Sequence, residues 1–175
     1  MCVERSTSQS FEEWARADGV QLRRAALLLT GNAHDADDLV QDTLVRVFAK
    51  WPRVRTMENR GGYARRVLIN RHLSLGRRLQ RLRARQNLMM GGDPAAEAPR
   101  DAAIDAQADL RRALLTLGPR QRAVVVLRYY LDLPDAQVAE ILNCSPATVR
   151  SQAHRALATL RNSVEIGAYN QEQGR

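Results

Sequence analysis

The sequence has few of the residues that build redox or metal centres. Cysteine occurs twice in 175 residues, at Cys2 and Cys144, and histidine occurs three times. Two cysteines so far apart exclude a disulfide framework, and no CxxC or Cys/His spacing predicts a zinc site. His34 lies among three aspartates, but one histidine among acids at a helix start is typical of capping and of complementing the helix dipole. We therefore expect neither a metal nor another cofactor.

Long apolar runs are also missing. No stretch approaches the roughly 18 apolar residues of a membrane span, and the first residues do not form a secretory signal peptide. The sequence therefore predicts a cytoplasmic protein without membrane insertion. Aromatic residues make up 5% of the chain although hydrophobic residues make up 45%, which favours two small Leu, Ala and Val cores over one large core. Since Leu, Ala and Arg are good helix formers, the predicted fold class is all-α.

Acidic residues are missing from one part of the chain, although the formal net charge of +8 is modest. Residues 1–59 carry eight Lys or Arg and nine Asp or Glu, whereas residues 60–85 carry nine arginines and no acid. Residues 88–106 then hold one arginine and four acids. A block of arginines this dense predicts a strip that binds a polyanion such as nucleic acid, and the alternative is a solvated helix face.

Helical periodicity with few breakers extends from Phe11 to about Arg85. Gly31-Asn32 ends a first helix, a second follows at 33–50, and a loop at 54–62 precedes an Arg-rich helix at 63–85. The stretch 88–105 is rich in Gly, Ala, Pro and acids, which predicts a flexible linker. The predicted organisation is a disordered N-terminus at 1–10, a helical domain at 11–87, the acidic linker at 88–105, a second helical domain at 106–165 and a polar tail at 166–175.

The segment 134–161 has the pattern of a helix-turn-helix. Ser145 suits the N-cap of a helix and Pro146 its first position, while Ala139 is small enough for two helices to cross closely. The alternative is a plain helical hairpin with a polar face, but the agreement of cap, small residue and turn length favours the helix-turn-helix. In such a motif the outer face of the second helix enters the major groove of DNA. The residues predicted on that face are Thr148, Arg150, Ser151, His154 and Arg155.

Three segments resemble the sigma-70 family of RNA polymerase sigma factors. HDADDLVQDTLVRVFAKW at 34–51 is similar to the polymerase-binding helix of that family, and RGGYARRVLINRHLSLGRRLQRLR at 60–83 is similar to its promoter-melting segment. LRRALLTLGPRQRAVVVLRYYLDLPDAQVAEILNCSPATVRSQAHRALATLR at 110–161 resembles its C-terminal domain. The two domains would then be sigma region 2, a helical bundle, and sigma region 4, which holds the helix-turn-helix. With these two domains and a short linker, the chain resembles the extracytoplasmic-function (ECF) group.

The resemblance implies a transcription initiation factor that binds core RNA polymerase through the β′ clamp and the β flap. Promoter DNA, both duplex and single-stranded, is the second implied partner. Relatives are commonly held inactive by an anti-sigma factor, but no residue of this sequence identifies one. The acidic and apolar residues of the helix at 34–51 suit a protein partner and would repel DNA. The implied polymerase contacts are Asp38, Leu39, Gln41, Asp42 and Phe48.

The resemblance also implies that the loop at 54–62 captures a base flipped out of the −10 promoter element. Asn70 matches the family's −10 contact position, and the exposed face of the recognition helix matches the residues that read the −35 element. Tyr63 stands where many relatives carry Trp, so we expect stacking on the separated strand to be weaker or to lie mostly in the loop. The implied −10 contacts are Asn59, Arg60, Tyr63, Arg66, Asn70 and Arg71.

Two other functions compete with a sigma factor that recognises both elements and promotes strand opening. A helix-turn-helix regulator that acts without polymerase would need a dimerisation surface and a palindromic operator. An enzyme that uses the Arg-rich helix as a substrate channel would need a catalytic set. Because the sequence contains no phosphate-cradling glycine loop and no nucleophile–base set, we do not expect an enzyme.

Overall fold

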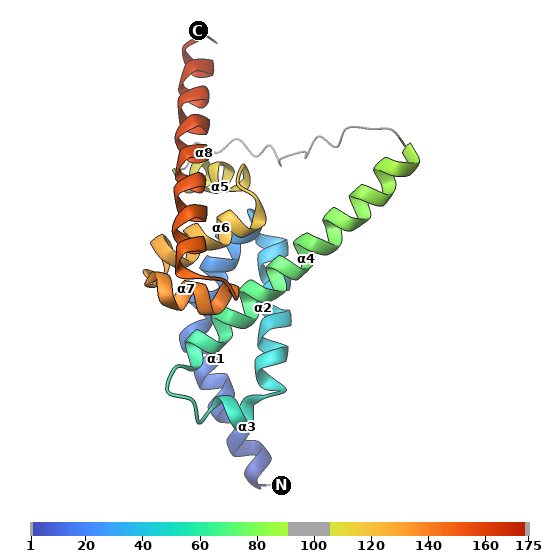
Figure 1. Cartoon of the computed structure of the whole chain (residues 1–175). Helices are drawn as coiled ribbons and strands as arrows, with labels where there is room; N and C mark the ends of the chain where they lie inside the picture. Colours follow the sequence, from blue (N-terminus) through green and yellow to red (C-terminus); the bar gives the residue numbers. More distant parts are fainter. Residues whose placement is uncertain (1, 91–105, 174–175) are drawn as a thin grey trace.

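The computed structural model describes the backbone of residues 2–90 and 106–173, and the side chains of residues 10–78, 81–82 and 108–162. Within these ranges every regular element is a helix, which confirms the predicted all-α class. In chain order (Figure 1) the elements are α1 (Cys2–Thr30), α2 (Ala33–Phe48), α3 (Trp51–Val54), α4 (Arg60–Met90), α5 (Ala106–Leu115), α6 (Pro119–Val125), a π-helical segment η1 (Val126–Tyr130), α7 (Asp135–Leu142) and α8 (Pro146–Gln173).

The first half of the molecule is a bundle of α1, α2 and α4, closed at one end by the short α3. An aromatic cluster lies at this end, where the rings of Phe11, Trp14 and Trp51 contact one another at centroid distances of 5.2–5.8 Å. The indole Nε1 of Trp51 donates a hydrogen bond to Ser10 Oγ at 3.0 Å. Helix α1 begins at Cys2, so it runs through the segment 1–10 that was expected to be disordered, and Trp51 anchors the last residue of that segment.

The turn between α1 and α2 depends on Gly31. Its φ of +85° lies in the left-handed region, which glycine adopts without a steric penalty. A Cβ at this position would lie 2.6 Å from Leu115 Cδ1 of α5, so the approach of the second half also requires glycine. Asn32 follows as the N-cap of α2, and its side-chain oxygen accepts a hydrogen bond from the backbone N–H of Asp35 at 2.8 Å.

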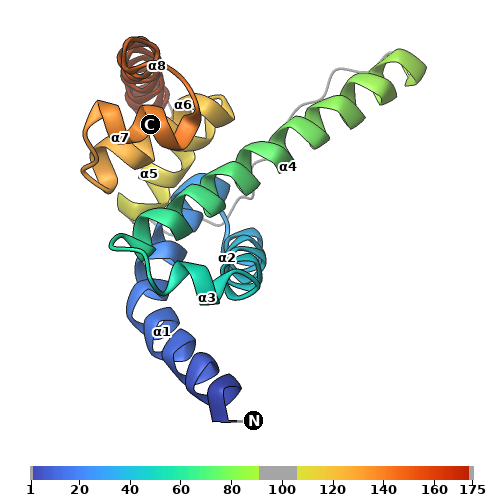
Figure 2. The same ribbon diagram turned by 60° about the horizontal axis from the view of Figure 1, so that its bottom comes forward.

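Helix α4 is longer than the predicted 63–85 at both ends. It continues to Met90, three residues into the predicted linker 88–105, and the remainder of that linker lies outside the described residues. Its second half projects away from the body of the molecule (Figures 1 and 2). Leu75 and Leu82 are exposed on this helix. Helix α8 likewise continues to Gln173, through most of the segment 166–175 that was predicted to be a polar tail.

The second half packs α5, α6 and α7 against α8, with α7 and α8 forming the helix-turn-helix. Val138 and Ala139 of α7 and Val149 and Ala153 of α8 are buried, as predicted. Asn143 ends α7 in the left-handed conformation, with a φ of 51°, which turns the chain sharply toward the second helix of the motif. The helical segment before the motif is divided into α6 and η1, where the Leu131 N–H bonds to the Val126 carbonyl.

One continuous core joins the two halves, whereas the composition favoured two separate cores. The buried cluster includes Leu29 of α1, Leu68 of α4 and Leu127 of η1. In Figures 1 and 2, α5, α6 and α7 lie beside the end of α1 and the first half of α4. The two helical domains therefore share apolar surface, with Leu114 and Leu117 in a smaller cluster beside the main core.

The side chain of Arg122 is buried where the two halves meet, with 9% of the residue exposed. Within the second half, its guanidinium donates to the carbonyls of Leu114, Leu115 and Leu117 at 2.8–3.1 Å. Across the junction, Nη1 donates to the Leu29 carbonyl at 2.6 Å. The carbonyls of Leu29, Leu114 and Leu115 lie in the last turns of α1 and α5, where a helix leaves its carbonyls without intrahelical partners, and Leu117 follows α5 in the chain. Burial lowers the pKa of Arg122 from its ordinary value.

His72 of α4 generates a pH prediction at this junction. Burial, and then the charge of Arg122, lower its pKa from 6.5 to about 4, and its Nε2 is buried without a hydrogen-bond partner. Between those pH values the unfolded chain binds more protons than the folded chain, because His72 is protonated only when unfolded. The free energy of unfolding is therefore unaffected by His72 above pH 6.5 and decreases as the pH falls toward 4. We expect His72 to cost the folded state about 2 kcal/mol between pH 7.5 and pH 5.

Urea unfolding of the wild type and of His72→Gln at the two pH values measures this cost. The variant should lose less stability on acidification than the wild type, by about that amount. Equal losses in the two proteins would contradict the assignment, because carboxylates elsewhere affect both proteins alike.

Gly76 of α4 provides a test of the packing between the halves. A Cβ at this position would lie 3.5 Å from Pro119 Cγ of α6, so a longer side chain would push the two elements apart. We expect Gly76→Glu to increase the radius of gyration in X-ray scattering while helical content is kept, since Glu favours a helix interior over Gly by roughly 0.5–1 kcal/mol. Gly19→Glu is the matched control, because no atom lies within 4 Å of a Cβ there. An unchanged radius for Gly76→Glu would contradict the packing.

Candidate nucleic-acid and protein interfaces

An exposed stripe of α2 combines acidic, polar and apolar side chains. Asp38, Gln41, Val45 and Phe48 are all exposed, and their spacing of three or four residues places them on one face of the helix. Val45 is 67% exposed and was missed from the sequence, although its spacing from Gln41 and Phe48 would have indicated it. A stripe of this composition suits a protein partner, since apolar contact area is flanked by an acidic residue.

Leu39 does not belong to this stripe, and its assignment as a polymerase contact is wrong. The residue is 2% exposed and lies in the core between the helices. Its position in α2 is one residue after the exposed Asp38, which turns its side chain by about 100° around the helix axis. Leu39 therefore stabilises the bundle that carries the stripe.

The carboxylate of Asp42 faces α4 and not the stripe. Its Oδ2 accepts a hydrogen bond from Arg46 Nε at 2.9 Å and forms an ion pair with Arg71 Nε at 2.7 Å. The structure thus brings together one residue assigned to polymerase binding and one assigned to −10 binding. The bond to Asp42 also raises the pKa of Arg46, so this guanidinium remains charged.

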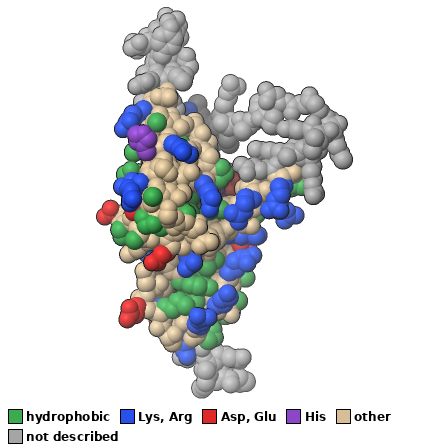
Figure 3. All heavy atoms as spheres, in the orientation of Figure 1, with side chains coloured by type: hydrophobic (Ala, Val, Ile, Leu, Met, Phe, Trp, Pro, Cys, Tyr) green, Lys and Arg blue, Asp and Glu red, His purple; other side chains and the backbone are tan. Residues whose placement is uncertain are grey.

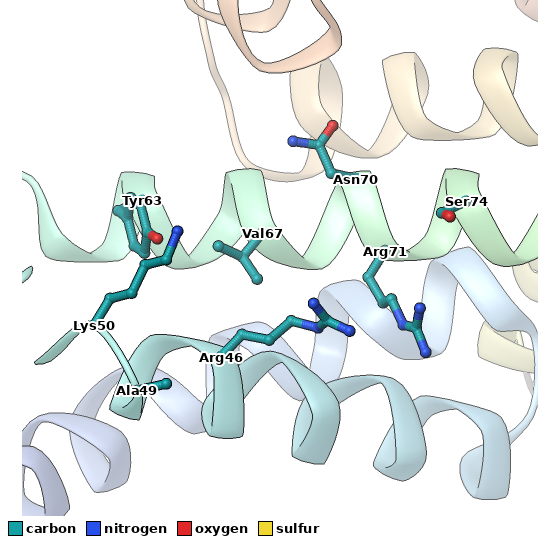
Figure 4. Close-up of a pocket in the computed structure, with 8 residues that line it drawn as sticks. All are labelled: Arg46, Ala49, Lys50, Tyr63, Val67, Asn70, Arg71 and Ser74. Carbon is teal, nitrogen blue, oxygen red and sulfur yellow. The ribbon is translucent and has the colours of Figure 1, made fainter.

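An open groove of about 470 Å³ lies between α2 and the first half of α4 (Figure 4). One wall is a stripe of α4 that holds Tyr63 and Asn70 together with Arg71, all three of which were predicted from the sequence. The other wall comes from the end of α2 and the two residues after it, and its cations Arg46 and Lys50 were not predicted. The complete lining is Arg46, Ala49, Lys50, Tyr63, Val67, Asn70, Arg71 and Ser74. Three cations, one aromatic ring and one amide around an open groove suit an anionic strand with exposed bases.

The other predicted −10 residues lie outside this lining. Asn59 caps α4, because its Oδ1 accepts a hydrogen bond from the Gly62 N–H at 2.7 Å. A Cβ on Gly62 would lie 2.6 Å from the Asn59 amide, so the cap requires glycine there. Arg60 and Arg66 are exposed on α4. The structure therefore brings Tyr63, Asn70 and Arg71 together, and leaves Arg60 and Arg66 as exposed charges beside them in the chain.

All five residues predicted on the recognition helix α8 are exposed. Ser145 caps this helix as predicted, since its Oγ accepts a hydrogen bond from the Thr148 N–H at 3.1 Å. The Thr148 hydroxyl is bonded to the same Ser145 Oγ at 2.9 Å, and the Ser151 hydroxyl donates to the Thr148 carbonyl at 3.0 Å. The long side chains of Arg150, His154 and Arg155 are thus the ones that extend furthest from the helix.

Cationic side chains follow α4 and cover α8 on one face of the molecule, as Figure 3 shows. Within the described residues, no group of three or more His, Cys, Asp or Glu side chains could hold a metal ion. No helix in the same ranges is long and apolar enough to cross a membrane. The recognition helix and the separate cationic groove are two surfaces of one chain, and the composition of each suits a nucleic-acid partner.

Comparison with known proteins gives the family. A model described as Sigma-70 region 2 matches residues 14–82, and one described as Sigma-70, region 4 matches residues 107–160. The RNA polymerase sigma-E factor of Streptomyces coelicolor is 36% identical over 157 residues, which cover 88% of this chain and 85% of that protein. The ECF RNA polymerase sigma factor SigL of Mycobacterium tuberculosis is 32% identical over 150 residues, which cover 82% of each chain.

A solved structure agrees with these relatives. The sigma factor RpoE of Bartonella quintana, in complex with the anti-sigma factor NepR, superimposes with a TM-score of 0.70 at 25% identity, covering 90% of this chain and 98% of that one. The chain belongs to the sigma-70 family, and its similarity to ECF sigma factors confirms the group that the sequence resembled.

Proposed function

We propose that this protein binds core RNA polymerase, recognises the −35 and −10 elements of a specific set of promoters, and promotes strand opening to initiate their transcription. The observation that carries the proposal is that α2 contributes residues to two different surfaces. One face presents the exposed acidic and apolar stripe, while Arg46 and its neighbours form one wall of the cationic groove. A protein partner on the stripe and a nucleic-acid strand in the groove would therefore lie on neighbouring faces of the same helix.

The stripe is the proposed polymerase contact, at the β′ clamp, and a further contact of the second half with the β flap follows from family membership. Asp38 and Gln41 supply polar contacts, while Val45 and Phe48 supply apolar area. Phe48 also contacts Phe11 of α1 edge to face at 4.9 Å, so its ring is partly fixed before a partner binds. A side chain that is already fixed loses less conformational entropy on binding.

The groove is the proposed site for the separated −10 strand. Arg46, Lys50 and Arg71 would attract its phosphates, and the Asn70 amide can exchange hydrogen bonds with the edge of an unpaired base. Tyr63 offers a ring on which one base can stack, an interaction worth about 1–3 kcal/mol. Strand opening would then need no covalent chemistry, because its free energy comes from strand capture and from polymerase contacts.

The second half is proposed to read the −35 duplex through α8. Arg150 and Arg155 can pair with guanine in the major groove, and His154 can reach a base edge or a phosphate. The names of the two elements place them about 25 base pairs apart, which is about 85 Å of B-form DNA. Because the two halves share a core, we propose that they separate when both elements are bound together.

The solved relative from Bartonella quintana is a complex with an anti-sigma factor. We therefore include a protein of that class among the proposed partners, and we place the protein in the cytoplasm, where polymerase and promoter DNA are found.

Reversing the charge of Asp38 tests the polymerase contact. We expect Asp38→Lys to abolish co-purification with core polymerase and the promoter-dependent run-off transcript, because it replaces the acidic residue of the stripe with a cation. Asp109→Lys makes the same charge change at an exposed site on α5 and should leave both readouts unchanged. Normal co-purification of Asp38→Lys would refute the docking assignment. The absence of a promoter-dependent transcript from the wild type with core polymerase would refute the proposed function itself.

Truncating Arg150 tests the reading of the −35 element. We expect Arg150→Ala to lose roughly 1–3 kcal/mol of promoter binding, with the loss confined to promoters that carry the preferred −35 sequence. Arg161→Ala removes an exposed arginine further along the same helix and should have a smaller effect that is independent of sequence. Binding of the reconstituted holoenzyme to promoters with and without the preferred −35 sequence measures both. A uniform loss for Arg150→Ala would make it a phosphate contact.

A further inference from the structure

Arg150, the first arginine of the recognition helix, faces a carboxylate from the preceding helix of the motif. Its Nη1 lies 3.7 Å from Oδ2 of Asp135. Asp135 is the first residue of α7, so this ion pair crosses the helix-turn-helix. The Asp135 side chain is 20% exposed, whereas that of Arg150 is 62% exposed. The pair thus consists of a largely buried carboxylate and an exposed guanidinium.

Asp135 is itself held from a second direction. Its Oδ1 lies 3.1 Å from Nε of Arg128, which comes from η1. The guanidinium of Arg128 in turn lies over the ring of Tyr129, 5.4 Å from the centroid. The position of Asp135 in the first turn of α7 also favours its negative charge, because the N-terminal end of a helix carries a partial positive charge. In this series of three charged side chains, Arg128 and Asp135 are therefore held in place, and Arg150 extends toward solvent.

The ion pair between Asp135 and Arg150 adds little to the stability of the fold. A pair with one exposed partner contributes roughly 0–1 kcal/mol. A carboxylate beside a DNA-reading helix also repels phosphates, so it weakens binding to every sequence. This loss of affinity for all DNA is offset only if Asp135 improves discrimination between sequences. Orientation of Arg150 supplies that improvement, because recognition of guanine by two parallel hydrogen bonds requires the guanidinium plane to be aligned with the base edge.

We propose that Asp135 is a positioning residue that orients Arg150 and so determines how strictly the −35 element is read. The inference rests on the proposed function, since it concerns the DNA that α8 would contact. Arg128 acts one step further back, by holding the Asp135 carboxylate. Arginine has large rotamer freedom, and a partner that restricts it before binding reduces the entropy lost when the correct base pair is met.

The test uses the full chain reconstituted with core polymerase and a promoter library randomised across the −35 element. Wild type, Asp135→Asn, Arg150→Ala and the double variant are compared by the enrichment of each base at each position. Asparagine keeps the shape of Asp135 and removes its charge. We expect Asp135→Asn to reduce discrimination about two- to tenfold, the factor associated with ordering one long side chain, at the same base pairs that Arg150→Ala relaxes. The double variant should match Arg150→Ala alone.

Glu140→Gln is the matched control, because it neutralises an exposed acid on the same helix, and its selection profile should equal that of the wild type. Thermal unfolding by circular dichroism establishes that each variant is folded. Equal weakening of all sequences by Asp135→Asn would show a structural role and overturn the inference. Equal tightening of all sequences would show phosphate repulsion alone and overturn it as well. If Arg150→Ala leaves the profile unchanged, the −35 assignment of Arg150 fails, whatever Asp135 does.

Discussion

The buried guanidinium of Arg122 connects the parts of this molecule, because its hydrogen bonds are of two kinds. Three of its carbonyl partners, Leu114, Leu115 and Leu117, lie in its own half and close the C-terminal end of α5. The fourth, Leu29, lies at the end of α1 in the other half. A buried carbonyl without a partner costs about 1–3 kcal/mol, so the first three bonds hold the second half together whatever its position. The bond to Leu29 exists only while the halves are packed.

Charge is sorted along the chain so that neighbouring surfaces do not compete for the same partner. The exposed stripe of α2 contains Asp38 and no cation, whereas the groove beside it contains three cations. Asp42 separates the two, since its carboxylate is occupied by Arg46 and Arg71 and is not presented to solvent as a free acid. The same pairing fixes two of the groove's guanidinium groups. Asp42 therefore orders side chains of the groove from a position between the two surfaces.

Local signals in the sequence predicted the helix-turn-helix correctly, because a cap, a turn and a small crossing residue act over a few positions. Ser145 caps α8, and Ala139 is buried at the helix crossing. The signals failed where a side chain's environment depends on distant residues. Leu39 and Asp42 belong to the segment that resembles the polymerase-binding helix, but only the packing of the bundle buries Leu39, and only the approach of α4 brings Arg71 to Asp42. Arg122 gave no signal, since arginine is almost never fully buried unless it is paired, and its partner Leu29 lies 93 residues away.

The packed arrangement has a consequence for how the two proposed DNA surfaces would act. The groove residue Asn70 and the recognition residues of α8 remain exposed while the halves share a core, so packing hides neither surface. It fixes the two surfaces relative to one another through the shared core. Under the proposed function, the packed form can bind one element, and binding to both elements would require the halves to separate. Part of the free energy gained by binding the second element would then be used to break the bond to Leu29 and to expose the shared apolar surface. A promoter that carries only one element would not provide that free energy.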